Sequence, residues 1–418
     1  MVSETGGTLS ARLGHSLRSR PRAGADVVPR RFVPAPRSGS FLPVAVLTAL
    51  LLGALLLNVG LGSVRVAPNQ ILVVAGTHLR ETLADVPGGE EIGVGWRYVL
   101  DLPGIGAAAG WLDAQTAWLQ RWARPEVSQR EDAVVWAIRI PRTLLGAVIG
   151  AGLAVSGAAM QGVFRNPLAD PGLIGVSSGA ALGAVTAIVL DITLFGIWTL
   201  PVFAFLAGLA VTLTVYALAR HDGKTEIVTL LLAGVAINAI AGATTGLLIS
   251  VANDQELRSV TFWTLGSLGG TRWEHVGIVG VVTAVGVAIT YPLRMPLNLF
   301  VLGEREARHL GVHVERVRLV LILTTAAMTG TAVAFAGAIG FVGLVVPHLV
   351  RLWLGPDHRR LIPMSALAGA TLLLAADLVS RTLAAPTEFP IGVTMSIVGG
   401  PFFLWLILRT RREGGGWA

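Results

Sequence analysis

The sequence carries no residue pattern that fits catalysis on a bound substrate. It has no cysteine, which excludes thiolate nucleophiles, thiolate metal sites and disulfides. It contains no G-x-x-x-x-G-K-[ST] phosphate loop and no H-E-x-x-H zinc motif, and Gly175-Val-Ser-Ser-Gly179 does not have the spacing of a nucleophile elbow. We therefore expect no catalytic residue, no metal ligand and no permanently bound cofactor, and the chain is not expected to hydrolyse ATP.

Ionic side chains beside apolar runs offer a different chemistry, the recognition of carboxylates. Arg139, Arg142 and Arg381 each stand at the end of such a run, and a guanidinium presents a planar fork to a carboxylate. Anchoring at the membrane surface is the simpler alternative for such arginines. Asp377 lies inside an apolar run, four residues before Arg381, and this spacing predicts a local ion pair rather than a proton relay.

A second cluster of charges surrounds two glycines between residues 294 and 316. Two short helical pieces are expected, one on each side of Gly311. A polar and compact helix–Gly–helix unit of this kind can dock into a groove of another protein. A solvated amphipathic loop is the alternative for this segment. The residues that would form such a docking surface are Gly303, Glu304, Glu306, Ala307, Arg308 and Gly311.

Composition shows what kind of protein must position these residues. Among 418 residues, 14% are charged and 53% are hydrophobic, and the mean hydropathy is +0.69. Ordinary globular domains contain about 25% charged residues. A soluble fold could not bury so much apolar surface, whereas a helical membrane protein exposes it to lipid. Composition therefore predicts an all-α polytopic membrane protein.

Ten apolar segments have a length close to that of a bilayer-spanning helix, about 20 residues. A possible amphipathic surface helix over 67–83 lies in the longest expected loop, 63–133. The predicted spans are 41–62, 141–164, 172–191, 198–220, 227–250, 273–293, 317–335, 338–355, 361–381 and 391–409.

The distribution of charge predicts the orientation. With the N-terminus inside, 21 of the 32 basic residues and 10 acidic residues are cytoplasmic, against 11 basic and 14 acidic residues outside. This asymmetry favours cytoplasmic N- and C-termini in a bacterial cell membrane. Residues 1–40 form a basic tail expected to be disordered against anionic lipid, and 411–418 form a cytoplasmic tail. The membrane explains the net charge of +7, so no nucleic-acid partner is expected.

An ordered series of motifs over about 134–410 resembles the FecCD-like permease subunits of bacterial ABC importers for iron-siderophores, haem and cobalamin. Residues 88–131 fall outside this pattern. The motifs are Arg139-Ile-Pro-Arg-Thr143, Gly157-Ala-Ala-Met-Gln161, Asn166-Pro-Leu-Ala-Asp-Pro171, Gly175-Val-Ser-Ser-Gly179, the segments 297–311 and 335–348, Phe389-Pro-Ile-Gly-Val393 and Gly400-Pro-Phe402.

The resemblance implies a cobalamin-importer-permease-like fold and a role for each candidate residue. It implies a homodimer with a central pathway, two ATPase subunits that hold ATP-Mg, and an extracytoplasmic substrate-binding (lipo)protein. Residues 294–316 would couple to the ATPase. Arg139, Arg142 and Arg381 would dock the binding protein. Asn166 and Leu168 would belong to the cytoplasmic gate, and Asn238 and Arg258 to the pathway.

The substrate is expected to be an iron-containing chelate. The stretches 232–242 and 257–270 are most similar to those of haem permeases, so haem is the favoured substrate. A ferric siderophore is the alternative, and cobalamin a less favoured one. For Arg258, the sequence leaves open both a contact with haem propionates and a loop-ordering pair with Asp254 or Glu256. An intramembrane enzyme and a proton- or sodium-driven transporter are disfavoured, because Asp377 has no second buried carboxylate beside it in the sequence.

Overall fold

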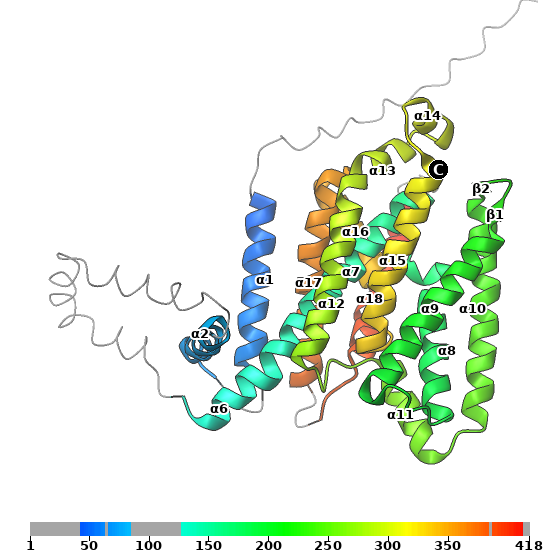
Figure 1. Cartoon of the computed structure of the whole chain (residues 1–418). Helices are drawn as coiled ribbons and strands as arrows, with labels where there is room; N and C mark the ends of the chain where they lie inside the picture. The colour runs from blue at the N-terminus through cyan, green and yellow to red at the C-terminus, as the bar shows by residue number, and fades with distance from the viewer. Residues whose placement is uncertain (1–41, 63–65, 85–126, 384–386, 413–418) are drawn as a thin grey trace, which may run out of the picture. The chain divides into compact units, whose positions relative to one another are not determined.

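The computed structural model describes residues 42–62, 66–84, 127–383 and 387–412. The predicted basic tail 1–40, most of 88–131 and the last six residues lie outside this range. The described chain is a helical bundle with one short hairpin, in which strand β1 (Arg220–His221) pairs antiparallel with β2 (Lys224–Thr225) (Figure 1). The predicted all-α fold class is confirmed.

Among the described residues, seven helical stretches are long and apolar enough to cross a membrane, and three shorter apolar helices complete the ten predicted positions. The seven contain α1 (Leu42–Gly60), α7 (Ile140–Phe164), α9 (Thr199–Leu218), α10 (Ile227–Ser250), α12 (Trp273–Thr290), α15 (Val314–Ala336) and α17 (His358–Thr382). The shorter three are α8 (Val176–Val189), α16 (Val342–Leu354) and the apolar part Ile391–Leu406 of α18 (Ile391–Arg412). The other helices are α2 (Pro68–Ala84), α6 (Gln129–Ala133), α11 (Asp254–Leu265), α13 (Arg294–Phe300) and α14 (Glu304–His309), of which α6 continues into α7 and α13 continues the stretch of α12.

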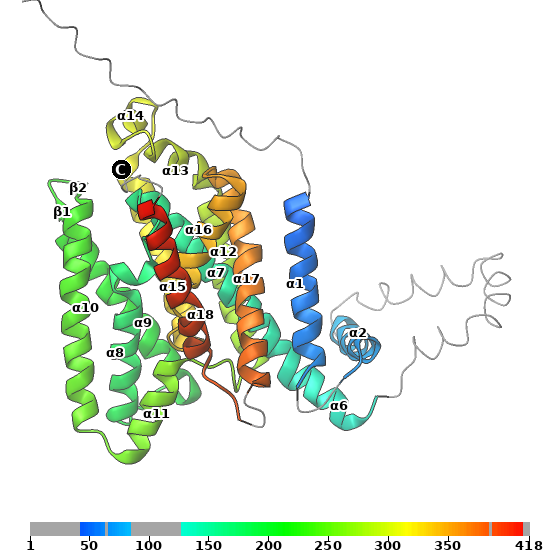
Figure 2. The same cartoon turned by 180° about the vertical axis from the view of Figure 1, so that it is seen from behind.

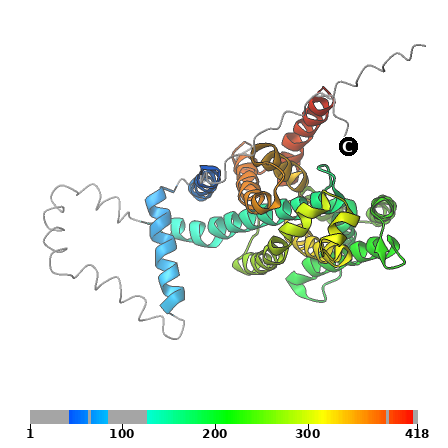
Figure 3. The ribbon, with the colours of Figure 1, turned by 90° about the horizontal axis from the view of Figure 1, so that it is seen from above.

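The bundle has two ends that carry different elements. In Figure 1, α13, α14 and the hairpin lie at one end, here named the α14 end, and α2, α6 and α11 lie at the opposite, α11 end. Figure 2 shows α18 beside α16 and α17 from behind. Figure 3 shows α2 side-on where α1 is end-on, so α2 crosses the direction of the spans. The predicted helix over 67–83 is therefore present, and it lies across the bundle end.

The second span starts earlier than the sequence predicted. A start at Pro141 was expected, but the helix runs back through a π-helical turn, η1 (Val134–Arg139), to α6, where Ser128 and Glu131 form a capping box. In the wider π turn the Ile140 amide bonds to the carbonyl of Val135, five residues back. A π turn of this kind is a recognised way to place an irregularity inside a helix. Arg139 consequently lies within a continuous helix rather than before it.

Helix α7 is the centre of the bundle. In its apolar window 78% of residues are buried, against 17% for α1 and α10. Glycines bring its backbone against its neighbours: a Cβ at Gly157 would overlap the carbonyl oxygen of Gly343 in α16, and one at Gly150 would overlap that of Gly369 in α17. Small residues of this kind allow close helix contact where lipid supplies no hydrophobic driving force.

The remaining helices form a group around α8 and α9. Ala180, Ala184 and Ala204 from these two helices pack with Val333 and Ala334 of α15. Helix α10 packs on α8, and it exposes many of its large apolar side chains, among them Leu232 and Leu247. Helix α15 therefore connects the α8–α10 group to α7.

Candidate functional site

The predicted coupling segment forms a compact unit at the α14 end. The two short helices, α13 and α14, flank Gly303 and not Gly311, so the expected arrangement around Gly311 was wrong; the element after Gly311 is the long helix α15. Gly303 has φ +120° and Gly311 has φ +86°, which are conformations that favour glycine. Ala307 is fully buried, whereas Glu306 and Arg308 are exposed. The segment therefore exposes charged side chains, while the buried Ala307 anchors it to the bundle by apolar packing.

Helix α13 is held to the start of α17 by a short polar network. The Asn298 side-chain amide donates to Asp357 Oδ1 at 2.6 Å, and its oxygen accepts from the His358 backbone amide at 2.9 Å. Partial burial opposes ionisation of Asp357, but the Arg359 backbone amide and the Asn298 donor prevail and lower the pKa of this carboxyl group below its usual value. These contacts fix one side of the coupling segment to the bundle.

A buried arginine fixes the other side of the coupling segment. Arg318, on the first turns of α15, has a side chain that is 1% exposed. It pairs with Glu304 at the start of α14 and with Glu315 at 2.9 Å, and it donates to the carbonyl of Thr225 in β2 at 2.9 Å. The Thr225 amide donates in turn to Glu315 at 3.1 Å. Three elements therefore meet at Arg318.

The chain turns sharply between α7 and α8, where Asn166 and Leu168 were assigned to a gate. The Asn166 side chain accepts from the Leu168 amide at 2.9 Å, and Asp170 caps the short 3-10 helix η2 (Pro171–Ile174) by accepting from the Gly172 amide at 2.8 Å. Burial raises the pKa of Asp170, and the Gly172 amide partly opposes this. Asx-type bonds of this kind give the turn a defined shape.

Helix α10 rests directly on this turn. Asn238 donates to the Gly172 carbonyl at 3.2 Å and accepts from the Ser178 hydroxyl, so its side chain faces protein. A Cβ at Gly234 would overlap the carbonyl oxygen of Leu173, whereas Gly242 has open space around it. Of these two glycines of α10, Gly234 therefore packs closely against its neighbour, and Gly242 does not.

Arg139 and Arg381 are both engaged inside the chain at the α11 end, where they bind the end of α1. Arg139 donates to the carbonyl of Val59 at 2.7 Å. Arg381 donates to the carbonyl and the side-chain oxygen of Asn58 at 2.9 and 2.8 Å. The last carbonyls of a helix lack intrahelical donors and carry partial negative charge, which two guanidinium groups satisfy here. Docking of a binding protein by these residues stays a prediction.

Arg142 and Asp377 form a buried ion pair between α7 and α17. Asp377 accepts from Arg142 at 2.8 Å and lies 3.1 Å from Arg381, so the predicted pair with Arg381 is present and is joined by a second arginine. Arg142 also binds Glu388 at 2.9 Å. Asp377 therefore binds one arginine of α7 and one of its own helix, α17, in a buried place.

Arg258 stands apart from these clusters. It is exposed on α11 and has no hydrogen-bond or ionic partner among the described residues. The expected pair with Glu256 is wrong, because Glu256 binds Asn253 in the capping box that starts α11. Asp254, the other alternative partner, likewise forms no hydrogen bond or ion pair with Arg258 among the described residues.

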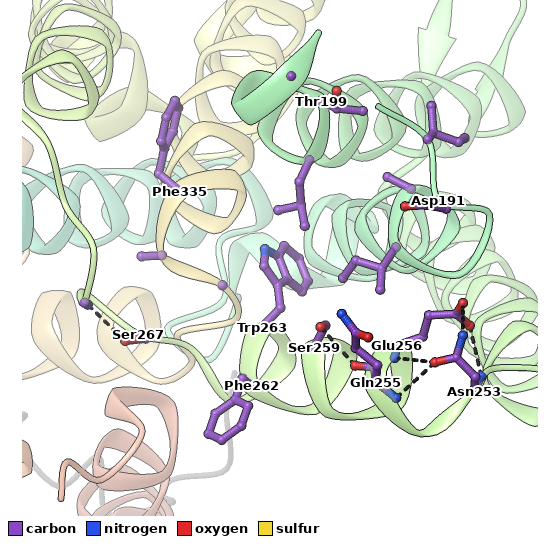
Figure 4. A pocket seen from close by; sticks show the side chains of 18 residues that line it. Asp191, Thr199, Asn253, Gln255, Glu256, Ser259, Phe262, Trp263, Ser267 and Phe335 are labelled. Carbon is purple, nitrogen blue, oxygen red and sulfur yellow. Dashed lines mark hydrogen bonds between the residues drawn. The ribbon is translucent and has the colours of Figure 1, made fainter. Parts of the chain in front are cut away.

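A pocket of about 690 Å³ opens at the α11 end (Figure 4). Its wall combines aromatic rings from Trp263 and Phe335 with polar groups of α11, and its carboxylates come from Asp191 and Glu256. Arg258, the cation predicted to belong to the pathway, therefore does not line this acidic and aromatic pocket.

Sequence reasoning missed three participants in these clusters. Arg318 falls inside a predicted span, and a basic residue in an apolar run three residues after Glu315 was the available signal. Asn58 is a buried amide in an otherwise apolar helix, which is a similar signal. Glu388 carried no signal, because its partner Arg142 is 246 residues away.

Comparison with known proteins places the chain in a family. Residues 104–409 match the FecCD transport family, so the match begins inside the stretch 88–131 that the motifs had left outside. The hemin transport system permease protein HmuU of Yersinia pestis is 47% identical over 286 residues, covering 68% of this chain and 85% of that protein. The cobalamin import system permease protein BtuC of Halobacterium salinarum is 41% identical over 358 residues, covering 85% and 94%.

A solved structure supports the same assignment. A metal-chelate type ABC transporter in an inward-facing conformation matches 88% of this chain and 98% of its own, with a TM-score of 0.68 and 28% identity. The helical fold, the spans and the sequence match agree along most of the chain. The chain therefore belongs to the FecCD transport family and is the membrane permease subunit of an ABC importer, in which a partner ATPase hydrolyses ATP.

Proposed function

We propose that this permease imports haem, as a homodimer with two ATPase subunits and an extracytoplasmic binding protein. The observation that carries the substrate is the 47% identity to a hemin transport permease, against 41% and 42% to the cobalamin permeases of Halobacterium salinarum and Escherichia coli. The similarity of 232–242 and 257–270 to haem permeases points the same way. Exposed Arg258 is a cation that haem propionates could approach without displacing an internal partner.

The proposal fixes the orientation of the bundle. Both termini and the α14 end face the cytoplasm, and the α11 end with its pocket faces outward, in agreement with the charge distribution. The exposed charges of α14 then meet the ATPase, and the turn at Asn166 and Leu168 lies on the cytoplasmic side as part of the gate. Arg139, Arg142 and Arg381 lie on the outward side, where the binding protein docks.

Titration of the purified complex with haemin tests the substrate. We expect loaded binding protein to stimulate ATP hydrolysis and haem to enter proteoliposomes, followed by its Soret absorbance. Excess cyanocobalamin and excess ferric siderophore serve as competitors. Stimulation and uptake with haem that neither competitor reduces support the proposal, whereas uptake of a competitor in place of haem contradicts it.

Cobalamin is the second candidate, because the alignment with the Halobacterium salinarum permease is longer than that with the hemin permease, 358 residues against 286. The competitor arm of the same experiment identifies this outcome. Transport of labelled cobalamin with no Soret change would replace haem by cobalamin and leave the importer assignment intact.

A further inference from the structure

Arg318 is placed where three parts of the permease meet, and none of the roles described above uses it. Its side chain is 1% exposed and belongs to α15, yet its partners lie on α14, on α15 and in the hairpin before α10. An arginine can hold several acceptors at once because its five N–H donors have fixed directions. We propose that Arg318 is the positioning residue that connects the coupling helix α14 to α10, and through α10 to the turn between α7 and α8. This proposal rests on the proposed function of α14 as the ATPase contact.

The first step of the connection joins α14 to α15. Glu304 is the first residue of α14, and its carboxylate binds both the buried Arg318 and the half-exposed Arg308 at 3.3 Å. Ala307 anchors the same helix by apolar burial. Since α14 has one turn and a half, these two attachments determine where its outer charged surface stands.

The second step joins α15 to the hairpin. The Thr225 backbone is held from both sides, because its carbonyl accepts from Arg318 and its amide donates to Glu315. Thr225 itself is 5% exposed. Helix α10 begins two residues later, at Ile227. A displacement of α14 that carries Arg318 with it is therefore delivered to the first turn of α10.

The third step joins α10 to the gate turn. Asn238 bonds to Gly172 and Ser178, and Gly234 lies against the carbonyl of Leu173. Because the backbones of α10 and η2 meet at Gly234, no flexible side chain lies between these two elements. Movement of α10 along its axis would therefore move the turn that contains Asn166 and Leu168. Contiguity of contacts does not itself demonstrate energetic coupling, so the test must measure coupling.

The chain offers matched variants for this test. Arg318→Met keeps the length of the side chain and removes its charge and donors, and Arg318→Lys restores the charge as a single point. Arg316→Met is the control, because Arg316 is exposed two residues away and has no ionic partner among the described residues. Glu315→Gln is a milder variant that leaves Arg318 in place.

The first measurement uses the permease without its ATPase. The native chain has no cysteine, so Arg305→Cys on α14 and His221→Cys in β1 provide two unique spin-label sites, both exposed. We expect a narrow distance distribution in the otherwise native chain and in Arg316→Met, and a broadened one in Arg318→Met. An unchanged distribution in Arg318→Met would overturn the connection whatever α14 binds.

The second measurement uses the complete importer in proteoliposomes. We expect Arg318→Met to bind the ATPase and hydrolyse ATP but to transport about tenfold less substrate per ATP, a loss within the usual range of coupling between sites. Arg318→Lys should recover part of this ratio, and Arg316→Met all of it. A native ratio in assembled Arg318→Met overturns the proposal. If Arg318→Met does not fold, Glu315→Gln provides the test. A native ratio of substrate to ATP together with a narrow spin-label distance distribution would then overturn the proposal. A reduced ratio together with a broadened distribution would support it.

Failure of the proposed function gives a different pattern. Charge reversal at exposed Glu306 and Arg308 should abolish ATPase binding if α14 is the contact. Unchanged binding in that double variant refutes the role of α14, and the coupling role of Arg318 fails with it, while the spin-label result still reports whether the physical connection exists.

Discussion

Guanidinium groups at the α11 end bind carbonyls and carboxylates of their own chain. Arg142, in particular, is 9% exposed and holds Asp377 between α7 and α17. A buried ion pair adds little net stability over an apolar pair, but removing one partner leaves a charge without compensation. These arginines therefore have a structural role before any binding protein arrives.

The residue-scale prediction concerns Arg142→Met. We expect the free energy of unfolding to fall by about 3 kcal/mol, because Asp377 then keeps Arg381 as its cation but loses the shorter contact. Thermal unfolding of the purified permease, without binding protein, measures this, with exposed Arg130→Met as the control. A native unfolding temperature together with weakened docking would instead identify Arg142 as a docking residue.

At the scale of elements, the contact between α7 and α16 depends on backbone meeting backbone. We expect Gly157→Ala to destabilise the permease by about 1–3 kcal/mol, because its methyl group would overlap the Gly343 carbonyl. Gly242→Ala on α10 is the matched control, since no atom lies within 4 Å of its Cβ position. It should be neutral or stabilising by about 0.5–1 kcal/mol. Tryptophan fluorescence during heating compares the two, and equal melting would contradict the close contact.

The position of α14 depends on the backbone at Gly311. We expect Gly311→Val to uncouple ATP hydrolysis from transport, because φ +86° costs a β-branched residue about 1–2 kcal/mol and the turn into α15 must shift. Gly311→Asn is the control, since asparagine tolerates left-handed backbone. Substrate transported per ATP is the quantity to measure. Native coupling in the valine variant would remove Gly311 from the coupling unit.

Helix positions follow from hydropathy far better than the partners of charged residues do. Helix α10 spans 227–250 both as predicted and as observed, because twenty or more apolar residues fit few structures other than a span. The partner of Arg142 could not be found in this way, because Asp377 lies 235 residues away in the sequence. The i,i+4 spacing of Asp377 pointed only to Arg381. The π turn before Ile140 was missed as well, since its i to i−5 bonding leaves no pattern in apolar periodicity.

For the molecule as a whole, two subunits would place two copies of Arg258 at the outward side of the assembly. We expect Arg258→Ala to reduce haem uptake while leaving assembly and basal ATP hydrolysis unchanged, because buried propionates without a cation cost several kcal/mol. Arg258→Lys should retain part of the uptake. The comparison is initial haem uptake into proteoliposomes, and a native rate in the alanine variant would exclude Arg258 from the pathway.

Close contact of α7 with both α16 and α17 has a consequence for how the permease changes shape. Backbone carbonyl groups of α16 and α17 pack directly against glycines of α7, and this contact prevents the helices from sliding or rotating past one another. The three helices should therefore move as one rigid body. Any alternation of access must then be taken up by helices outside this group and by the turns around them. Amide hydrogen exchange during turnover would separate the two groups: deuterium should enter α7, α16 and α17 at one slow rate in every state, and the exchange of α10 should change with each step of the cycle.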